Sequence, residues 1–101
     1  MVAARRRLEP VRNAMSLRKR FRELISAPGM VLAPGAYDAL SARIIEAQGF
    51  DVVVAGGYAA AGSLLGQPDT GQSNMRDYAD HYGRICAAVN VPVYVDGDTG
   101  F

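Results

Sequence analysis

The chain has 101 residues, of which 50% are hydrophobic, and it carries eleven basic and ten acidic side chains. This composition supplies a globular core and excludes a disordered or collagen-like chain. No apolar run approaches the roughly 18 residues that span a bilayer, so we expect no membrane association. The single cysteine, Cys86, excludes an internal disulfide and a multi-cysteine zinc site, and it suits the reducing cytoplasm.

The charges are divided between the two ends of the chain. Residues 1–22 hold eight basic residues and one acid, whereas residues 23–101 hold three basic residues and nine acids. We interpret residues 1–14 as a basic leader with little apolar pattern. An over-extended start, with initiation at Met15, is favoured over a solvated tail or an Arg-rich targeting peptide. Nucleic-acid binding is not expected, because no aromatic or polar base-reading groups accompany the arginines.

From Met15 onward the chain predicts alternating helices and strands. A first amphipathic helix begins there, with its basic residues on the solvated face. After a Pro-Gly breaker, the apolar run at residues 30–33 predicts a buried strand. Residues 38–48 predict a second helix, which Asp38 favours at its start and Gly49 stops. The expected apolar faces are Leu17, Phe21, Leu24 and Ile25 in the first helix, and Leu40, Ile44 and Ala47 in the second.

A second strand is predicted over residues 50–55 because of its β-branched run. A long connection rich in small residues follows at 58–72. Ser73 is expected to cap a further helix over residues 74–89, which Asn90 closes. One face of this helix is apolar or aromatic at helical spacing and comprises Tyr78, Tyr82, Ile85 and Val89.

A third strand, over residues 91–95, completes a strand–helix–strand–helix–strand pattern. Near-continuous apolar strands that alternate with helices are typical of a parallel sheet covered by helices. In the two architectures of this kind, the barrel and the open doubly wound sheet, sites form at the C-terminal ends of the strands. Residues typical of sites follow all three predicted strands: 34–37, Gly56 with Gly57, and Asp96 with Asp98.

Asp96 and Asp98 are the most informative pair. Two carboxylates one residue apart at a strand end can both turn toward a hard cation, and Mg²⁺ or Mn²⁺ prefers such oxygen ligands. The adjacent Gly97 and Gly100 allow a tight loop. Spacing alone leaves a pair of solvated turn aspartates as the alternative. Asp69 is likewise either a turn residue or a site carboxylate carried by a mobile loop.

Gly56 and Gly57 follow a predicted buried strand and expose backbone N–H groups that a carboxylate or phosphate could approach. A simple turn is the alternative for this pair. Cys86 is interpreted as a buried structural cysteine without a basic neighbour. His81 is interpreted as a solvent-facing partner of Asp77 on the same helix.

Three segments resemble the isocitrate lyase and phosphoenolpyruvate mutase superfamily, particularly its methylisocitrate lyase and carboxyphosphonoenolpyruvate phosphonomutase-like branch. In order they are residues 34–43 (PGAYDALSAR), 55–69 (AGGYAAAGSLLGQPD) and 95–101 (VDGDTGF). The resemblance runs from about residue 17 to the last residue. It implies an α/β fold in which residues 15–101 are an incomplete (β/α)₈ barrel, its N-terminal part of about three βα units.

The resemblance also implies a function. The expected enzyme is a Mg²⁺-dependent (or Mn²⁺-dependent) lyase that cleaves a C–C bond in a small 2-hydroxy or 2-oxo carboxylate through a pyruvate-type enolate. Asp96 and Asp98 would be the metal-side carboxylates, acting directly or through water. The full-length enzyme would be a homo-oligomer. The residues that would bind substrate or line its pocket are Ala55, Gly56, Gly57, Asp69 and Tyr37.

The sequence departs from the family pattern in two places. Ala55 replaces the usual serine and removes a hydroxyl group from the expected site. Residues 64–65 carry one residue more than the Ser-Leu-Gly form of the methylisocitrate branch, which leaves another lyase or a hydrolase relative open.

The family's catalytic loop, of Lys-x-Cys-Gly-His type, is expected beyond Phe101, and Cys86 is not its cysteine. We therefore assign no catalytic residue, and we expect the isolated chain to be inactive and poorly folded because its sheet edge is open.

Three alternatives remain at this stage. The same scaffold supports phosphonomutase or other P–C bond chemistry. A phosphotransferase of the haloacid dehalogenase kind would use Asp96 as its nucleophile, although that motif usually stands near the start of a chain. A noncatalytic binding module would use the basic arm and would bind an anionic polymer in a salt-sensitive way.

Overall fold

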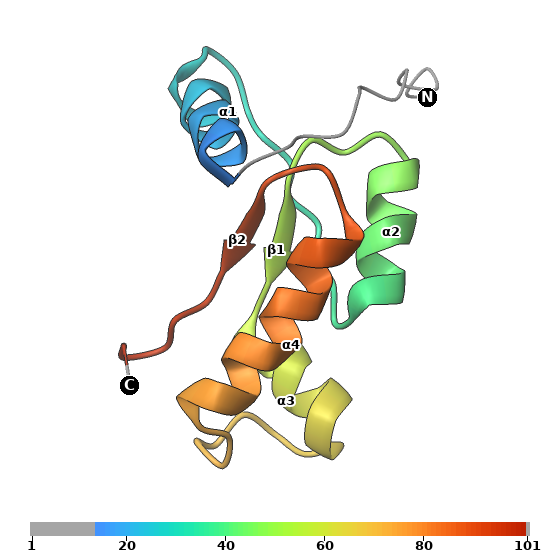
Figure 1. The fold of residues 1–101 in the computed structure, drawn as a ribbon, viewed down its shortest axis with the longest axis vertical. Helices are drawn as coiled ribbons and strands as arrows, with labels where there is room; N and C mark the ends of the chain where they lie inside the picture. Colours follow the sequence, from blue (N-terminus) through green and yellow to red (C-terminus); the bar gives the residue numbers. More distant parts are fainter. Residues whose placement is uncertain (1–13, 101) are drawn as a thin grey trace.

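The structure is a computed structural model and describes residues 14–100. The expected basic leader lies outside the described residues apart from Ala14. In the described part, four helices and two strands alternate around a small parallel sheet, as Figure 1 shows. In chain order the elements are α1 (Ala14–Ser26), α2 (Ala39–Ala47), β1 (Val53–Ala55), α3 (Gly57–Leu65), α4 (Met75–Ala88) and β2 (Val93–Val95).

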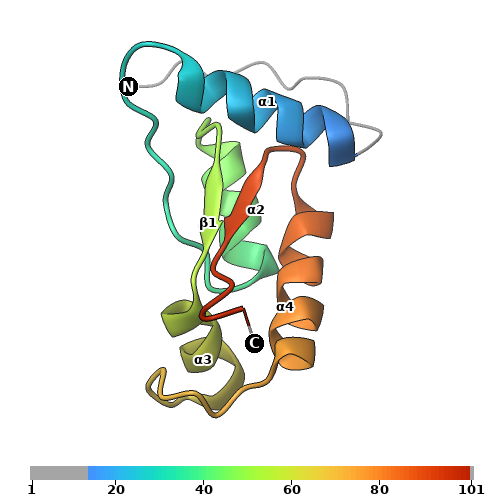
Figure 2. The same ribbon diagram turned by 90° about the vertical axis from the view of Figure 1, so that its left-hand side faces the viewer.

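Strands β1 and β2 form a parallel pair that α3 and α4 connect. The pairing is extended at its carboxyl end, where the Asp96 N–H donates to the Ala55 carbonyl over 2.9 Å. Helices α2 and α4 pack together on one face of the pair, and α1 crosses its amino end (Figures 1 and 2). The register places Val53 opposite Val93, Val54 opposite Tyr94 and Ala55 opposite Val95.

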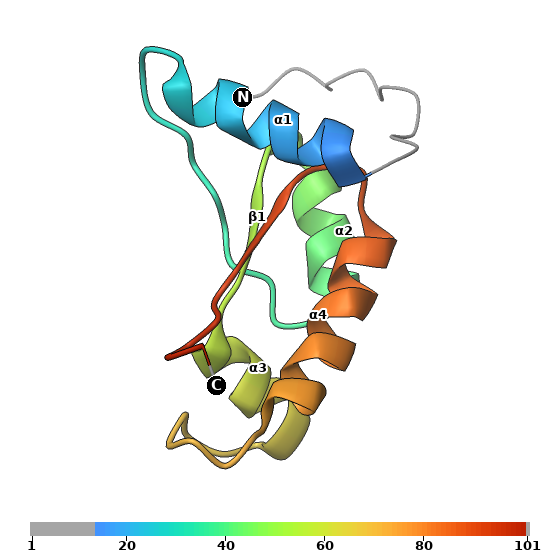
Figure 3. The same cartoon turned by 60° about the vertical axis from the view of Figure 1, so that its left-hand side comes forward.

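The predicted first strand, residues 30–33, does not form. An isolated parallel bridge joins Gly35 to Val54 instead, and Figure 3 shows the preceding segment running as an extended chain from α1. A longer ladder in that register would place Ala33 opposite Val52, where the chain has only just left the turn at Gly49. No described strand lies in register beside residues 30–33, so these residues have no partner strand with which to form backbone hydrogen bonds. Met30 and Leu32 are exposed as a result.

Helix α2 has the predicted ends. Asp38 is its N-cap and accepts a hydrogen bond from the Ser41 N–H over 2.8 Å, and Gly49 follows the helix at φ 98°. The bonds from Ser41 hold the pKa of Asp38 below its usual value. The predicted apolar face is wrong, because Leu40 and Ile44 are exposed whereas Ala42 is fully buried. The helix has apolar residues on most of its circumference, so its sequence is compatible with more than one apolar face. In the structure the buried face is the one that contains the small side chain of Ala42.

Residues 58–72 are not a continuous loop, because their first half forms α3. The run Ala59, Ala60 and Ala61 consists of the strongest helix-forming residue, which outweighs the glycines beside it. Gly66 ends the helix in the left-handed conformation at φ 63°, and its N–H donates to the Gly62 carbonyl over 2.9 Å. The predicted connection was therefore wrong over residues 58–65, because the glycines and other small residues there were taken to indicate a loop.

Helix α4 begins one residue later than predicted. Its N-cap is Asn74 rather than Ser73: the Asn74 side chain accepts from the Asp77 N–H over 3.0 Å, and the Asp77 carboxylate accepts from the Asn74 N–H over 3.1 Å. The C-cap is Val89, so Asn90 does not close the helix. The Asn90 N–H instead donates to the Glu46 carboxylate over 2.7 Å and ties the turn before β2 to α2.

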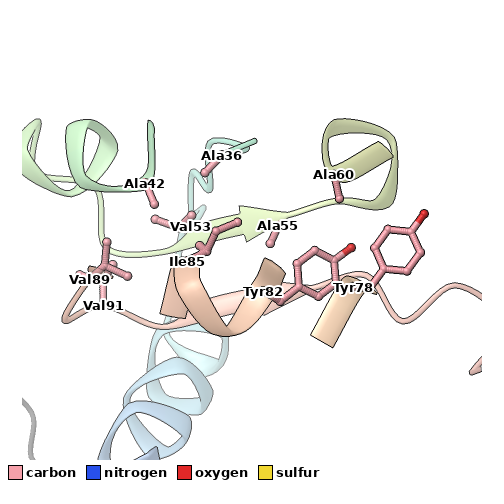
Figure 4. Packing of buried hydrophobic residues seen from close by; sticks show 10 residues of the cluster. All are labelled: Ala36, Ala42, Val53, Ala55, Ala60, Tyr78, Tyr82, Ile85, Val89 and Val91. Atoms are coloured by element: carbon pink, nitrogen blue, oxygen red, sulfur yellow. The ribbon is translucent and has the colours of Figure 1, made fainter. Parts of the chain in front are cut away.

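The hydrophobic core lies between β1, α2 and α4. The predicted face of α4 is confirmed, since all four of its members are buried. Figure 4 shows Ile85 beside Val53 of β1, with the ring of Tyr82 nearer Ala55. The cluster comprises Ala36, Ala42, Val53, Ala55, Ala60, Tyr78, Tyr82, Ile85, Val89 and Val91.

Helix α1 confirms the first predicted helix and covers an apolar groove of about 640 Å³ beside β2. The ring of Phe21 lies 6.0 Å from that of Tyr94, and Arg20 forms a 3.4 Å ion pair with Asp51. Cys86 lines this groove and is exposed, which corrects its assignment as a buried cysteine. It follows Ile85 by one residue and is therefore rotated off the buried face of α4. Partial burial still raises the pKa of its thiol.

Among the described residues, no helix combines the length and the apolar character needed to cross a membrane.

Candidate functional site

The carboxyl ends of β1 and β2 lead into polar segments that meet. Helix α3 begins directly after β1, with Gly56 as its N-cap and Gly57 as its first residue. Asp96 directly follows β2, and its Oδ2 accepts a hydrogen bond from the Gly57 N–H over 3.3 Å. The start of a helix carries partial positive charge, so a carboxylate is favoured there. The parallel pairing thus brings together two residues that are 39 positions apart.

Asp69 reaches the same place from the loop after α3. A Cβ atom built on Gly57 would lie 3.2 Å from Asp69 Oδ2 and 3.3 Å from Asp96 Oδ2. A side chain at this position would therefore push both carboxylates away by a few tenths of an ångström. We call Gly57, Asp69, Asp96 and Asp98 the strand-end cluster.

The backbone of Asp98 binds the second oxygen of the Asp96 carboxylate. The Asp98 N–H donates to Asp96 Oδ1 over 2.8 Å, so each oxygen of that carboxylate accepts one backbone hydrogen bond. Asp98 adopts the left-handed conformation at φ 51°, which a non-glycine residue rarely adopts. This turn leaves both carboxylates exposed to solvent at the mouth of the cluster.

Two tyrosines of α4 extend the site beyond what the sequence interpretation included. Tyr78 and Tyr82 are buried and stacked, with ring centroids 5.7 Å apart. Burial and the negative charge of Asp96 raise the pKa of Tyr82 to about 12. Burial and the charge of Asp69 raise that of Tyr78. The sequence placed both tyrosines on the core face, but it gave no sign that this face reaches the carboxylates.

His81 is the clearest correction in this region. It is 7% exposed rather than solvent-facing, and its Nε2 lies 2.8 Å from the Tyr37 carbonyl oxygen. Asp77, its expected partner, is engaged in the N-cap of α4. The helical spacing contained the necessary signal, because His81 follows Tyr78 by three residues and therefore shares its buried face.

The other predicted site residues take different positions. Tyr37 is exposed and follows the bridge on the edge of β1 opposite to β2, so its described contacts are with Ser41 and His81 rather than with the strand-end cluster. The Ala55 side chain is fully buried in the core, and its carbonyl accepts from the Asp96 N–H. Gly56 is half-buried at the start of α3.

The strand-end cluster has a donor set that fits a largely hydrated magnesium ion. Within residues 14–100, no three His, Cys, Asp or Glu side chains are close enough together to hold a metal ion directly. Mg²⁺ commonly keeps several waters and binds through one or two carboxylates. Asp69 and Asp96 bring two carboxylate groups together beside Gly57, which suits that mode.

These features define a class of protein: an α/β chain whose polar groups gather where parallel strands end and a helix begins. The family described as phosphoenolpyruvate phosphomutase matches residues 21–101. The chain belongs to the phosphoenolpyruvate mutase/isocitrate lyase superfamily. The resemblance identified from the sequence is therefore confirmed.

Individual relatives match most of the chain. It is 45% identical over 87 residues to 2,3-dimethylmalate lyase of Eubacterium barkeri, which covers 86% of this chain and 30% of that protein. It is 45% identical over 85 residues to the chloroplastic carboxyvinyl-carboxyphosphonate phosphorylmutase of Arabidopsis thaliana, covering 83% of this chain and 25% of that protein. The chain thus spans less than a third of the length of these relatives.

Solved structures agree with these matches. The crystal structure of oxaloacetate acetylhydrolase superposes with a TM-score of 0.76 at 32% identity, over 82% of this chain and 30% of that one. A crystal structure of 2,3-dimethylmalate lyase superposes with a TM-score of 0.75 at 34% identity, over the same shares.

Proposed function

We propose that this chain forms the metal- and carboxylate-binding part of a (β/α)₈-barrel enzyme that cleaves a C–C bond in a small 2-hydroxy or 2-oxo carboxylate. The observation that carries the proposal is the meeting of Asp69 and Asp96 at Gly57. The ends of the parallel strands, a helix start and acidic side chains coincide there. The 2,3-dimethylmalate lyase relative supports the reaction class.

Asp96 and Asp98 are the proposed metal-side carboxylates, and Asp69 is the third carboxylate near the ion. A bound Mg²⁺ would supply positive charge that stabilises the negative charge developing on a 2-oxo group during bond cleavage. Asp96 is already oriented by the Gly57 and Asp98 N–H groups, so little ordering is needed when the ion binds.

Gly56 and Gly57 are proposed to hold the substrate carboxylate. The first N–H groups of a helix lack partners within the helix, and α3 presents these groups where β1 ends. The Gly57 N–H donates to Asp96 in this structure, so a bound substrate carboxylate would share that N–H with Asp96. Fixing the carboxylate there would align the breaking bond with the metal side of the site. Ala55 contributes only backbone to this arrangement, because its methyl group is buried in the core.

Phosphorus–carbon bond chemistry is the second candidate. The match to the Arabidopsis phosphorylmutase is as strong in identity as the match to the lyase. In this proposal both reactions would use a metal ion beside a carboxylate-binding helix start, so the described residues would serve either one. The family match favours these two chemistries over the haloacid dehalogenase alternative.

Residue-resolved NMR of the ¹⁵N-labelled chain tests the site. Dispersed amide signals must first show that the chain is folded, against the expectation of poor folding. Sub-stoichiometric Mn²⁺ should broaden the amide signals of Gly57, Gly97 and Asp98 first, because paramagnetic relaxation falls steeply with distance. Asp96→Asn should remove this broadening. The matched control is Asp80→Asn, which removes an exposed carboxylate on α4 and should leave the broadening unchanged. Broadening centred on α4, or broadening that survives Asp96→Asn, would contradict the proposed metal site.

The carboxylate subsite and the reaction are tested separately. With Mg²⁺ present, oxalate should shift the amide signals of Gly56 and Gly57, and shifts elsewhere only would count against this subsite. Incubation with 2,3-dimethylmalate should yield no pyruvate and propionate from the 101-residue chain, since the resemblance assigns the catalytic cysteine to a loop beyond Phe101. Turnover by this chain would overturn that assignment.

A further inference from the structure

Tyr82 carries a buried hydroxyl group whose partner is missing from the described protein. The residue is 8% exposed, and its hydroxyl group has no hydrogen-bond partner among the described residues. Buried hydroxyl groups in native proteins almost always have a partner, either from the protein or from an ordered water. The position of this hydroxyl group therefore calls for an explanation.

The surroundings of the Tyr82 ring lead toward the strand-end cluster. The ring stacks on Tyr78 and lies in the core near Ala55 and Ala60, the residues that bracket the start of α3 (Figure 4). Of the carboxylates that act electrostatically on the Tyr82 hydroxyl group, Asp96 has the largest effect, followed by Asp69. The hydroxyl group and the cluster therefore share one region of negative potential.

The hydroxyl group is a hydrogen-bond donor at neutral pH, because burial and the charge of Asp96 raise its pKa to about 12. Asp96 has acceptor capacity to match. Its carboxylate has about four lone-pair positions, of which the Gly57 and Asp98 N–H groups occupy two. A metal ion and one further donor can use the remainder.

A single water would satisfy both sides. A buried water needs two to four polar partners. Here the Tyr82 hydroxyl group would donate to it, while Asp96 and Asp69, which flank Gly57 at 3.3 Å and 3.2 Å from a built Cβ, would accept from it.

We propose that Tyr82 is a positioning residue for the strand-end cluster and that its hydroxyl group donates to a water shared with Asp96 and Asp69. This inference rests on the proposed metal site and adds a residue from α4 to it. Through the water, Tyr82 orients the carboxylates that receive the ion. Outer-sphere partners of this kind typically change metal affinity by 10–100-fold when they are removed.

Tyr82→Phe is the decisive variant because it removes one oxygen atom and keeps the ring. If the hydroxyl group acts through the water, Mn²⁺ affinity measured by electron paramagnetic resonance should fall about tenfold. The melting temperature of the metal-free chain should not fall. The matched control is Tyr58→Phe, which removes an exposed hydroxyl group on α3 and should leave Mn²⁺ affinity unchanged.

Each outcome decides a different point. An unchanged affinity in Tyr82→Phe, with binding that Asp96→Asn abolishes, overturns the role of Tyr82 and leaves the metal site intact. Absence of Mn²⁺ binding in the wild-type chain overturns both. If Tyr82→Phe fails to fold, the wild-type chain itself provides the test. The ¹³Cζ signal of Tyr82 reports on the hydrogen bonding of its hydroxyl group and should shift when Mg²⁺ is added, and a signal insensitive to Mg²⁺ overturns the proposal.

Discussion

The two halves of α4 pack against the same sheet but differ in chemistry. The C-terminal half contributes Ile85, which is fully buried beside Val53 at the amino side of β1. The N-terminal part, up to Tyr82, contributes Tyr78, His81 and Tyr82, which are also buried but carry polar atoms. Because α4 runs back along the sheet, its N-terminal half lies where the strands end and the carboxylates gather (Figure 1).

This difference shows how one amphipathic face can serve both stability and binding. An aliphatic contact gains from burial alone, whereas a buried phenol or imidazole needs a hydrogen-bond partner. The N-terminal half therefore keeps polar groups in the core at a cost, next to the proposed metal site. Substitutions at three positions of α4, counting its N-cap, and at two glycines of α3 test this difference.

Ile85→Ala should have the largest effect. It removes a fully buried side chain from the aliphatic half and should lower the free energy of unfolding by about 2–5 kcal/mol, a large fraction of a small domain's stability. Urea unfolding followed by circular dichroism measures the change. Ile44→Ala, at an exposed position on α2, should cost much less, and equal losses would refute the burial of Ile85.

His81→Leu tests the polar half. It keeps the bulk of the side chain but leaves the Tyr37 carbonyl without its donor, which should cost about 1–3 kcal/mol. The same urea titration gives the loss, and hydrogen exchange should show increased opening around Tyr37. A neutral result would mean that the 2.8 Å contact does not stabilise the native chain.

Asn74→Ala should cost about 1 kcal/mol because it removes the side-chain cap from the first turn of α4. Asn74→Ser retains a capping oxygen and should stay within a few tenths of a kcal/mol of wild type. Thermal unfolding of the three proteins measures both values. An equal loss in the two variants would show that the cap is not the cause.

Two glycines in α3 give the smallest and most specific comparison. Gly62→Ala meets no atom within 4 Å and should stabilise the chain by about 0.5–1 kcal/mol through helix propensity. Gly57→Ala should stabilise the chain no more than Gly62→Ala does. It should also weaken Mn²⁺ binding severalfold, because its methyl group displaces Asp69 and Asp96. Thermal unfolding and Mn²⁺ titration measure the two effects. Equal Mn²⁺ affinity in the two variants would exclude crowding at Gly57.

The sequence predicted local features well where neighbouring residues determine them. Asp38 and Gly49 mark the two ends of α2, and the spacing of Tyr78 and Ile85 identified the buried face of α4. Caps depend on bonds within one turn, and a helical stripe depends only on the helix period. The same reasoning failed for residues 30–33, whose strand character required a partner strand in register.

The amino-acid sequence by itself determined that Gly57 and Asp96 follow strands, and it carried the motifs that identify the superfamily. Tertiary structure alone decided that Asp69 meets them and that the His81 ring lies against the Tyr37 carbonyl. The physical reason is sequence separation. Local propensity acts over a turn or two, whereas these outcomes depend on segments up to 44 positions apart that the parallel pairing and the packing of α4 bring together.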